Sequence, residues 1–483
     1  MLMGLLPVLG LVLIVFSCTM LVPLGFSWVL DDGALFDHVV AIAVTLSLGV
    51  TLRLIGRRSV RELRPRDGFV LVALVWTILP AVGTLPLLVH LPELSFTDAY
   101  FEAVSGLTTT GSTVLTGLEK LPVSINVWRC LMVLVGGMGI IVLTVAILPL
   151  LGVGGAQLFK AESAGPMKDE KLTPRIAETA RGLWGVYFAT AVACCLAYRW
   201  AGMGWADAFM HMCSTMGLGG FAAYDASFGA FDSPRIEAVA IVFMVIAGIN
   251  FALYFVAVKN RSLAVVWRDI EARTYLMVMA GSVLFVALFL TVHKVYPDFP
   301  TALRHAAFSV VSIATTTGFA TVDYAQWPIF APAFMLVLCS FATCAGSTGG
   351  GIKLIRSLLL MKQAQRELVR IVHPRAVVPV TLGGRLVPPQ VLVSVIAFML
   401  AYGAVSLIAS FLLMLSGLDL ITSVTAVIAS VNNTGPGLGQ VGPSGNYQGL
   451  SDFQTWVCTA CMLLGRLEML SLLVLFTPQF WRG

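Results

Sequence analysis

Four short polar tracts that each contain glycine interrupt the hydrophobic sequence of this chain. They are Thr109-Thr110-Gly111-Ser112, Leu218-Gly219-Gly220-Phe221, Thr316-Thr317-Gly318-Phe319 and Asn433-Thr434-Gly435-Pro436. A dehydrated monovalent cation must have its water replaced by oxygen atoms, and a ring of backbone carbonyls supplies them without the strong binding of a carboxylate. Glycine permits the backbone angles that turn successive carbonyls toward one axis. The chemistry that these tracts predict is that of an ion filter.

The tracts recur about every 100 residues, a period that indicates duplicated units. In three of them a threonine stands before the glycine, at Thr110, Thr317 and Thr434. Its hydroxyl can ligate an ion or fix the strand. The second tract has no threonine and the fourth carries Asn433. We therefore expect fewer well-ordered ion sites and looser selectivity than in a filter of four identical strands.

The composition requires a membrane. Of the 483 residues, 58% are hydrophobic and 11% are charged, far below the roughly 25% charged residues of a soluble domain. The first 30 residues carry no charge, which predicts a spanning helix and not a cleaved signal peptide. The net charge is a modest +5, and the basic residues lie in clusters. This pattern favours contact with anionic lipid headgroups, and we expect no binding of nucleic acid.

The hydropathy pattern predicts an all-α polytopic membrane protein. About ten apolar stretches approach the length of roughly 20 residues that spans a bilayer: 3–28, 35–54, 69–92, 126–151, 182–202, 235–258, 275–296, 329–361, 390–416 and 454–478. Four shorter, half-polar stretches each lead into a tract: 97–109, 205–217, 301–316 and 420–433. They are too short to cross the bilayer, so we expect re-entrant helices around a central pathway.

Each unit then consists of a spanning helix, a re-entrant helix, a tract and a second spanning helix. We expect a two-helix prefix at 1–65 and pore units at 66–155, 156–260, 261–372 and 373–483.

Lysine and arginine cluster in the loops between units, which predicts that those loops and both termini are cytoplasmic. The tracts then enter from the outer face. The clusters are Arg53, Arg57, Arg58, Arg61, Arg64 and Arg66; Lys160, Lys168, Lys171, Arg175 and Arg181; Lys259, Arg261, Arg268 and Arg273; and Lys362, Arg366, Arg370, Arg375 and Arg385.

Several segments resemble the bacterial Trk/Ktr potassium-uptake family. They are residues 101–111, Thr315-Thr316-Thr317-Gly318-Phe319, Asn432-Asn433-Thr434-Gly435-Pro436-Gly437 and Gly465-Arg466-Leu467-Glu468. The two-helix prefix is similar to the TrkH branch of that family. The resemblance implies potassium uptake across a bacterial inner membrane, K⁺ as the bound and transported ion, four non-identical pore units, a homodimer and a cytoplasmic nucleotide-binding ring of the TrkA kind. In the family one glycine per unit forms the filter core, and all four are present here.

The stretch 329–361 is interrupted by Cys344-Ala345-Gly346-Ser347-Thr348-Gly349-Gly350-Gly351. Each glycine costs a helix about 1 kcal/mol against alanine, so we expect a flexible loop just below the third tract. This segment also resembles the intramembrane loop of the family, which obstructs ion passage until it moves. The alternative is that its glycines only permit close packing of helices.

Arg466 falls near the centre of the predicted helix 454–478. A charge there is costly, so it faces a wet cavity or a partner. The resemblance implies a place on the pore wall below the filter, where Arg466 would be an electrostatic barrier. Glu468 is two positions after Arg466 and therefore lies about 200° around the helix from it. We expect its side chain to form a hydrogen bond to a neighbouring helix and not to Arg466. Glu102 could lend a negative field near the filter or serve capping and packing.

Two other classes of function remain as alternatives. A proton- or sodium-coupled symporter would need carboxylates at broken helices, and the predicted spans are nearly free of Asp and Glu. A polytopic membrane enzyme would need clustered acid/base or metal-binding groups, whereas the six histidines are scattered. Cys458-Thr459-Ala460-Cys461 lies in an apolar helix, where cysteine packs as a small hydrophobe. The segment around Lys353 lacks the spacing of a phosphate-binding loop, so we expect no nucleotide on this chain.

Overall fold

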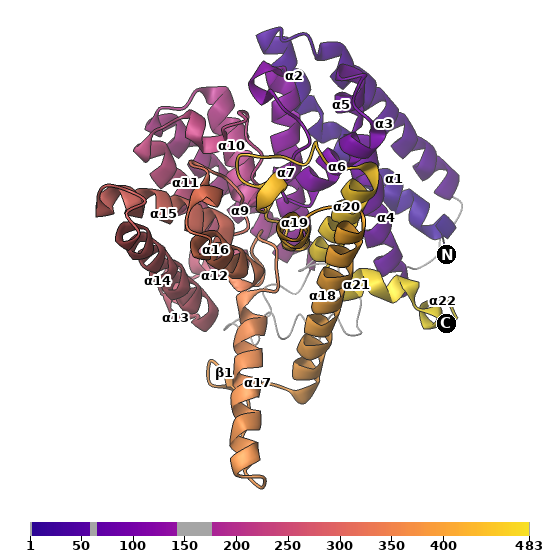
Figure 1. Cartoon of the computed structure of the whole chain (residues 1–483). Coiled ribbons are helices and arrows are strands. Elements are labelled where there is room, and N and C mark those ends of the chain that lie inside the picture. Colours follow the sequence, from indigo (N-terminus) through magenta and orange to yellow (C-terminus); the bar gives the residue numbers. More distant parts are fainter. Residues whose placement is uncertain (1, 58–64, 143–175, 483) are drawn as a thin grey trace.

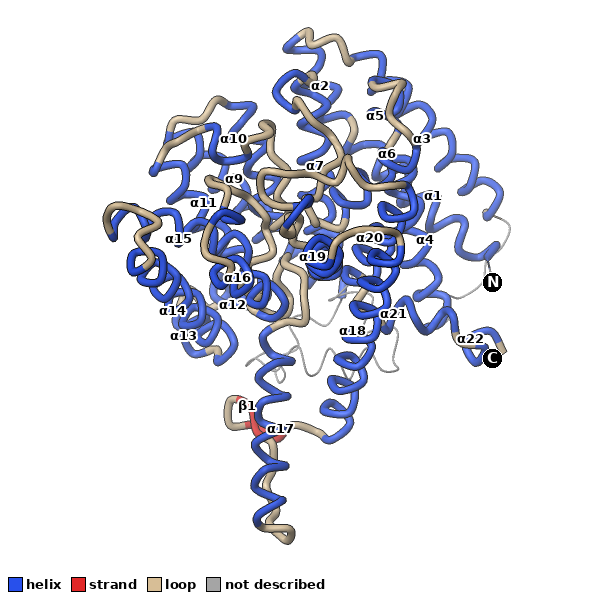
Figure 2. Tube along the Cα trace, in the orientation of Figure 1, coloured by secondary structure: helices blue, strands red, loops and turns tan. Residues whose placement is uncertain are grey.

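The computed structural model describes residues 2–57, 65–142 and 176–482. In these ranges the chain is almost entirely helical (Figure 2), and its one sheet there is an antiparallel ribbon of two strands, β1 (Thr381–Leu382) and β2 (Arg385–Leu386). The expected all-α fold class is confirmed.

The first three helices form a separate layer at one side of the molecule (Figure 1). They are α1 (Leu2–Thr19), α2 (Leu21–Leu30) and α3 (Leu35–Gly56). Helices α1 and α3 cross closely because two glycines face each other. A Cβ added to Gly49 would lie 3.0 Å from the carbonyl oxygen of Gly10, which shows how a pair of small residues lets two apolar helices approach.

The other helices, apart from the four that precede the tracts, follow in chain order. In the first half of the chain they are α4 (Pro65–Gly83), α5 (Leu85–His90), α7 (Val123–Val142), α9 (Ile176–Ala201), α11 (Pro234–Ala247), α12 (Phe251–Lys259) and α13 (Ala264–Arg268). In the second half they are α14 (Ile270–Val292), α16 (Phe330–Phe341), α17 (Leu354–Val372), α18 (Pro389–Leu415), α20 (Asp452–Arg466), α21 (Leu470–Leu473) and α22 (Pro478–Trp481).

Four short helices fill the four half-polar stretches. They are α6 (Phe96–Leu107), α10 (Trp205–Gly217), α15 (Phe299–Ala314) and α19 (Leu420–Val431). Side-chain oxygens cap the first turn of three of them, at Ser95, Asp298 and Asp419. Their carboxyl-terminal turns are buried and continue directly into the tracts. Since the carboxyl end of a helix carries a partial negative charge, four such ends favour a cation where the tracts meet.

The short helices are held by a contact that repeats four times. Each packs against the helix that follows the tract of the preceding unit: α10 against α7, α15 against α11, α19 against α16, and α6 against α20. The contact between α6 and α20 joins the last unit of the chain to the first, so the four units form a closed ring. The four segments therefore surround one centre (Figure 1).

Within the described ranges six helices are long and apolar enough to cross a membrane, and two further spans are bent pairs of helices. Of the remaining expected spans, 126–151 is represented up to Val142 by α7, and its part 143–151 lies outside the described residues. The span 329–361 is represented by α16 and α17, with a break between them. Two of the expected spans are each divided into two helices by a bend. The stretch 235–258 bends by 86° between α11 and α12, because Asn250 accepts a hydrogen bond from the backbone N–H of Ala252 and starts a new helix.

The stretch 454–478 bends by 105° after Arg466. Helix α20 ends there because Glu468 and Met469 both have positive φ, at 55° and 46°, which a right-handed helix cannot continue.

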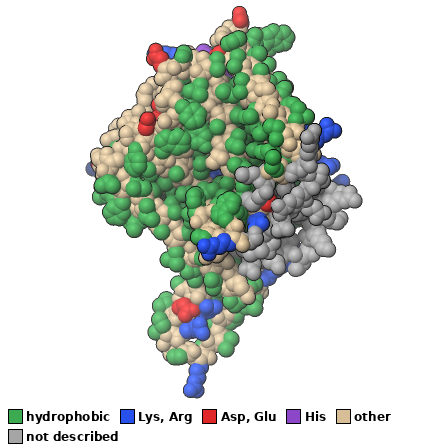
Figure 3. Space-filling model, turned by 90° about the vertical axis from the view of Figure 1, so that its right-hand side faces the viewer, with side chains coloured by type: hydrophobic (Ala, Val, Ile, Leu, Met, Phe, Trp, Pro, Cys, Tyr) green, Lys and Arg blue, Asp and Glu red, His purple; other side chains and the backbone are tan. Residues whose placement is uncertain are grey.

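Basic side chains gather at the end of the molecule where α17 and the lower part of α18 project from the body (Figures 1 and 3), and apolar side chains cover much of the broad upper part. Helix α17 carries Lys362, Arg366 and Arg370. Seven of the basic loop residues counted in the sequence lie outside the described residues: Arg58, Arg61, Arg64, Lys160, Lys168, Lys171 and Arg175.

Candidate functional site

The four tracts meet in a closed ring at the centre of the fold. Each tract glycine faces the backbone of a neighbouring tract so closely that a side chain would collide with it. The facing pairs are Gly111 with Gly220, Gly220 with Thr317 and Gly318, Gly318 with Thr434, and Gly435 with Thr110 and Gly111. An added Cβ would lie 2.6 Å from the carbonyl oxygen of Thr317 at Gly220 and 2.8 Å from that of Thr110 at Gly435. Residues about 100 positions apart in sequence thus share one site.

The backbone of the ring repeats in all four tracts. The residue two before the glycine is left-handed each time, with φ of 54° at Thr109, 54° at Leu218, 62° at Thr316 and 54° at Asn433. The glycines Gly111, Gly318 and Gly435 also have positive φ, between 82° and 97°. Gly220 does not share this conformation. The second tract, which has no threonine, is therefore also the one whose backbone differs.

Several carbonyl oxygens of the ring have no hydrogen-bond donor within the described part of the chain. They belong to Thr110, Gly111, Gly220, Thr317, Gly318 and Thr434. Thr110, Thr317 and Thr434 are buried, and the three glycines are half-buried at the cavity. Since buried carbonyls are almost always paired, such a group is suited to a ligand. The carbonyl of Gly435 differs, because it accepts hydrogen bonds from Ser112 Oγ at 3.0 Å and Tyr447 Oη at 2.9 Å. The six carbonyl oxygens without a donor can therefore coordinate a cation. The carbonyl oxygen of Gly435 is already bonded to two hydroxyl groups of the protein.

The threonine hydroxyls bond to the protein in two tracts. Thr108 Oγ1 lies 2.7 Å from Thr110 Oγ1, and Thr315 Oγ1 lies 2.7 Å from Thr317 Oγ1. The second tract has glycines at the equivalent positions, Gly217 and Gly219. The hydroxyls of Thr110 and Thr317 therefore fix the strand, which is one of the two roles expected for them.

One side of the ring opens into a cavity of about 240 Å³. All four tract glycines line it, together with the segments that follow the tracts. Asp225 also lies at this mouth, where its carboxylate accepts the backbone N–H groups of Gly117 at 2.7 Å and Leu118 at 3.0 Å. A single opening thus leads to all four glycines.

The segment between α16 and α17 lies against the opposite side of the ring, where the tracts begin. The N–H of Gly350 donates to Thr316 Oγ1 at 2.9 Å, and Thr348 Oγ1 donates to the carbonyl of Met216 at 3.0 Å. Residues 344–350 are almost wholly buried. The expected position of this loop, below the third tract, agrees with the structure.

Glu271, at the start of α14, connects both ends of the loop. Its Oε1 accepts the N–H of Ala345 at 2.8 Å and that of Ile355 at 3.2 Å. Glu271 is 5% exposed. The hydropathy pattern gives no signal for this residue, because Glu271 precedes the predicted span 275–296.

Arg466 is buried at the end of α20, and not in the middle of a helix as expected. Its NH1 donates to the carbonyl of Thr348 at 2.9 Å and its NH2 to that of Gly136 at 3.2 Å. Arg466 thus lies beside the loop, on the side of the ring opposite the cavity. As expected, Glu468 bonds elsewhere, since it forms an ion pair with Arg356 at 2.9 Å.

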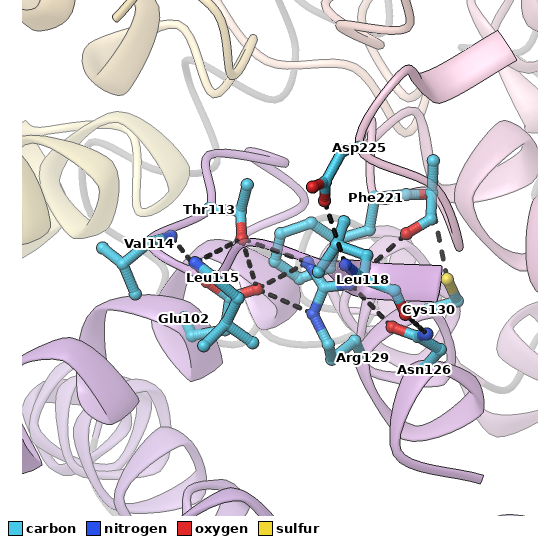
Figure 4. Close-up of polar contacts among 11 residues, drawn as sticks. Glu102, Thr113, Val114, Leu115, Leu118, Asn126, Arg129, Cys130, Phe221 and Asp225 are labelled. Carbon is cyan, nitrogen blue, oxygen red and sulfur yellow. Dashed lines mark hydrogen bonds and ion pairs between the residues drawn. The ribbon is translucent and has the colours of Figure 1, made fainter. Parts of the chain in front are cut away.

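Glu102 forms a buried ion pair with Arg129 on α7, behind the first tract (Figure 4). The sequence contained a signal for Arg129, because it is a charged residue inside the predicted span 126–151. Sequence reasoning did not use that signal.

One of the scattered histidines and both cysteines of the segment 458–461 are packed inside the protein. His211 is buried against the rings of Phe228 and Phe231. Cys458 and Cys461 are buried free thiols. Among the described residues, no group of three or more His, Cys, Asp or Glu could hold a metal ion.

Comparison with known proteins gave a match to the TrkH family, described as cation transport protein, over residues 35–482. The Trk system potassium uptake protein TrkH of Salmonella typhimurium is 46% identical over 476 residues, which cover 98% of each chain. The Trk system potassium uptake protein TrkG of Escherichia coli K12 is 37% identical over 98% of this chain and 97% of its own. The crystal structure of the potassium transporter TrkH from Vibrio parahaemolyticus matches with a TM-score of 0.92 and 42% identity, covering 100% of both chains.

Proposed function

The chain belongs to the TrkH family of cation transport proteins, and on this basis we propose that it carries potassium into the cell through the ring of four glycine tracts. Its relatives are named as transporters and not as enzymes. The observation that carries the proposal is the ring itself, in which four glycines border one cavity and six carbonyl oxygens lack a donor in the described residues. Carbonyls of this kind replace the water of a potassium ion.

The filter in this proposal comprises Thr109, Thr110, Gly111, Leu218, Gly219, Gly220, Thr316, Thr317, Gly318, Asn433, Thr434 and Gly435. Its symmetry is imperfect at two places. Gly220 departs from the backbone of the other glycines, and Gly435 has its carbonyl occupied by Ser112 and Tyr447. We therefore infer a filter with fewer ion sites than four identical strands would give.

The segment Cys344 to Gly351 is the gate in this proposal. Its contacts with Thr316 and Met216 support a position under the filter. An ion that leaves the ring on that side meets this loop and the guanidinium of Arg466. We assign Arg466 both a barrier charge and the bond that holds the loop.

We infer that the chain is divided into the prefix 1–65 and four pore units, 66–155, 156–260, 261–372 and 373–483. The fourfold contact between each short helix and the preceding unit supports this division. Basic residues on the projecting α17 and in the loops support an orientation with those loops and both termini in the cytoplasm of a bacterium, and the chain in its inner membrane.

The names of the relatives refer to a Trk system, which supports the proposal of partner subunits. We infer a homodimer above a TrkA-like nucleotide-binding ring, with the nucleotide on that ring. Within the described part of the chain, α17, which carries Lys362, Arg366 and Arg370, projects farthest from the helical body (Figure 1).

A substitution of Gly220 by alanine tests the filter in reconstituted vesicles. The added Cβ would lie 2.6 Å from the carbonyl oxygen of Thr317. The φ angle of Gly220 is not in the left-handed region, so the substitution tests this contact and not backbone strain. We expect potassium flux to be lost in Gly220→Ala and kept in the control Gly403→Ala, where nothing lies within 4 Å of the added atom. Equal flux in the two variants would contradict the filter.

Coupled symport is the second candidate, because Glu271 is a buried carboxylate at a break between helices, which is the kind of group such transporters use. A reversal potential that follows the potassium gradient alone, at varied proton and sodium gradients, excludes obligatory coupling. A reversal potential that shifts with either of those gradients supports it.

A further inference from the structure

The ion pair of Glu102 and Arg129 is fully buried behind the ring. Arg129 Nε lies 2.8 Å and NH2 2.7 Å from Glu102 Oε1, and both side chains are 0% exposed. Taking two charges out of water costs several kcal/mol per ion, which their attraction barely repays. A buried ion pair is therefore weak evidence for a role in stability. The other hydrogen bonds of Glu102 and Arg129 indicate a second role.

Glu102 holds the segment that leaves the first tract. Its Oε1 accepts a hydrogen bond from Thr113 Oγ1 at 3.0 Å, and its Oε2 accepts one from the N–H of Val114 at 3.0 Å. Arg129 NH2 also donates to Thr113 Oγ1, at 3.2 Å. Figure 4 shows Glu102 and Arg129 meeting at the hydroxyl of Thr113, two residues after Gly111.

Arg129 holds the segment that leaves the second tract. Its NH1 donates to the carbonyl of Ala222 at 3.3 Å, and its guanidinium lies 4.4 Å from the ring centre of Phe221. The side chain of Asn126 orients the same nitrogen, since its Oδ1 accepts from NH1 at 3.0 Å. Phe221 directly follows Gly220, so Arg129 acts on the tract that has no threonine of its own.

The second tract needs this external support. Tracts one and three each contain a pair of bonded threonine hydroxyls, whereas the second has Gly217 and Gly219 at those positions. We propose that Glu102 and Arg129 are a positioning pair that sets the spacing between the first and second tracts and thereby the discrimination between potassium and sodium. The pair touches no ion itself, and this inference rests on the proposed filter.

The physical reason is the direct contact of the two tracts. Gly111 lies against the backbone of Gly219 and Gly220, so a shift of either exit segment moves carbonyls on two sides of the ring. Sites of this kind need their groups held within about 0.5 Å by a supporting shell. Sodium is smaller than potassium, and a ring that can relax accommodates it at less cost.

Two substitutions remove single parts of this support. Arg129→Lys keeps the charge but cannot hold Glu102, Thr113 and Ala222 at once, because lysine lacks the planar fork. Thr113→Val keeps the shape and removes the hydroxyl between the two charged groups. Glu237→Gln and Arg304→Lys are the matched controls, since Arg304 and Glu237 form an ion pair of 2.7 Å between α15 and α11 that does not contact the tracts among the described residues.

The measurement is the ratio of potassium to sodium permeability from reversal potentials of purified, reconstituted protein, with folding checked by size-exclusion chromatography. We expect the ratio to fall about threefold to tenfold in Arg129→Lys and Thr113→Val, as the loss of charge-assisted bonds implies, and to stay unchanged in both controls. Folded variants of Arg129 and Thr113 with an unchanged ratio would overturn the inference. A wild-type protein without potassium selectivity would instead overturn the proposed function.

Discussion

The guanidinium of Arg466 and the carbonyl oxygen of Thr348 are joined by a hydrogen bond of 2.9 Å. The second nitrogen of the same side chain donates to Gly136 at 3.2 Å. Arg466 thus connects the loop under the ring to α7. In the proposed mechanism its charge and its bond to the loop both oppose ion passage, so one substitution removes both.

Arg466→Ala is therefore expected to raise potassium flux. The measurement is potassium efflux from vesicles at equal protein density. Arg199→Ala is a suitable control, because Arg199 also donates to a backbone carbonyl, that of Met203 at 2.9 Å, but is exposed and away from the loop. Unchanged or lower flux in Arg466→Ala at normal expression would rule out the barrier role.

Deleting Gly346 to Gly351 is expected to raise flux as well. This change removes the bond of Gly350 to Thr316 and that of Thr348 to Met216, so the segment loses the hydrogen bonds that hold it against the ring. Single-channel or vesicle recordings without any regulatory partner would measure it. A closed pathway in a deletion variant that still folds would mean that these glycines only serve packing.

Gly111→Ser is expected to admit more sodium relative to potassium. At Gly111 φ is +82°, and a Cβ would press on the backbone of Gly219 and Gly220, so the side chain must displace the neighbouring tract. The permeability ratio is the quantity to measure, with Gly281→Ser as control, because an atom added there meets nothing within 4 Å. A ratio equal to that of the wild type would count against Gly111 as part of the filter.

The sequence predicted those parts of the fold that depend on local chemistry. The four short helices, their tracts and the break near Gly346 follow from glycine, threonine and hydropathy within about 15 residues of each site. The prediction failed where one or two residues redirect the chain inside an apolar stretch, as Asn250 does by capping a new helix and as Glu468 and Met469 do by their positive φ. The bend at Asn250 and the end of α20 at Arg466 lie inside apolar stretches whose hydropathy gives no sign of either.

The sequence predicted which residues form the candidate site, but it did not predict which of them contact each other. A repeat of glycines indicates that the tracts belong together, whereas the pairing of Gly220 with Thr317 arises only when the fold closes the ring. The same holds for Glu102 and Arg129, which are 27 residues apart in sequence and meet because α6 packs on α7.

Glu271 offers a test of how the loop is held. Its Oε1 accepts two N–H groups, from Ala345 and Ile355, and each would cost about 1–3 kcal/mol if left buried and unpaired. Glu271→Ala is therefore expected to loosen the loop and raise potassium flux, measured in vesicles of matched protein content. Glu271→Gln keeps an oxygen acceptor at this position, so we expect its flux to stay near that of the wild type. An equal rise of flux in both variants would show that the charge of Glu271, and not its hydrogen bonds, controls passage, and unchanged flux in both would exclude a role of Glu271 in holding the loop.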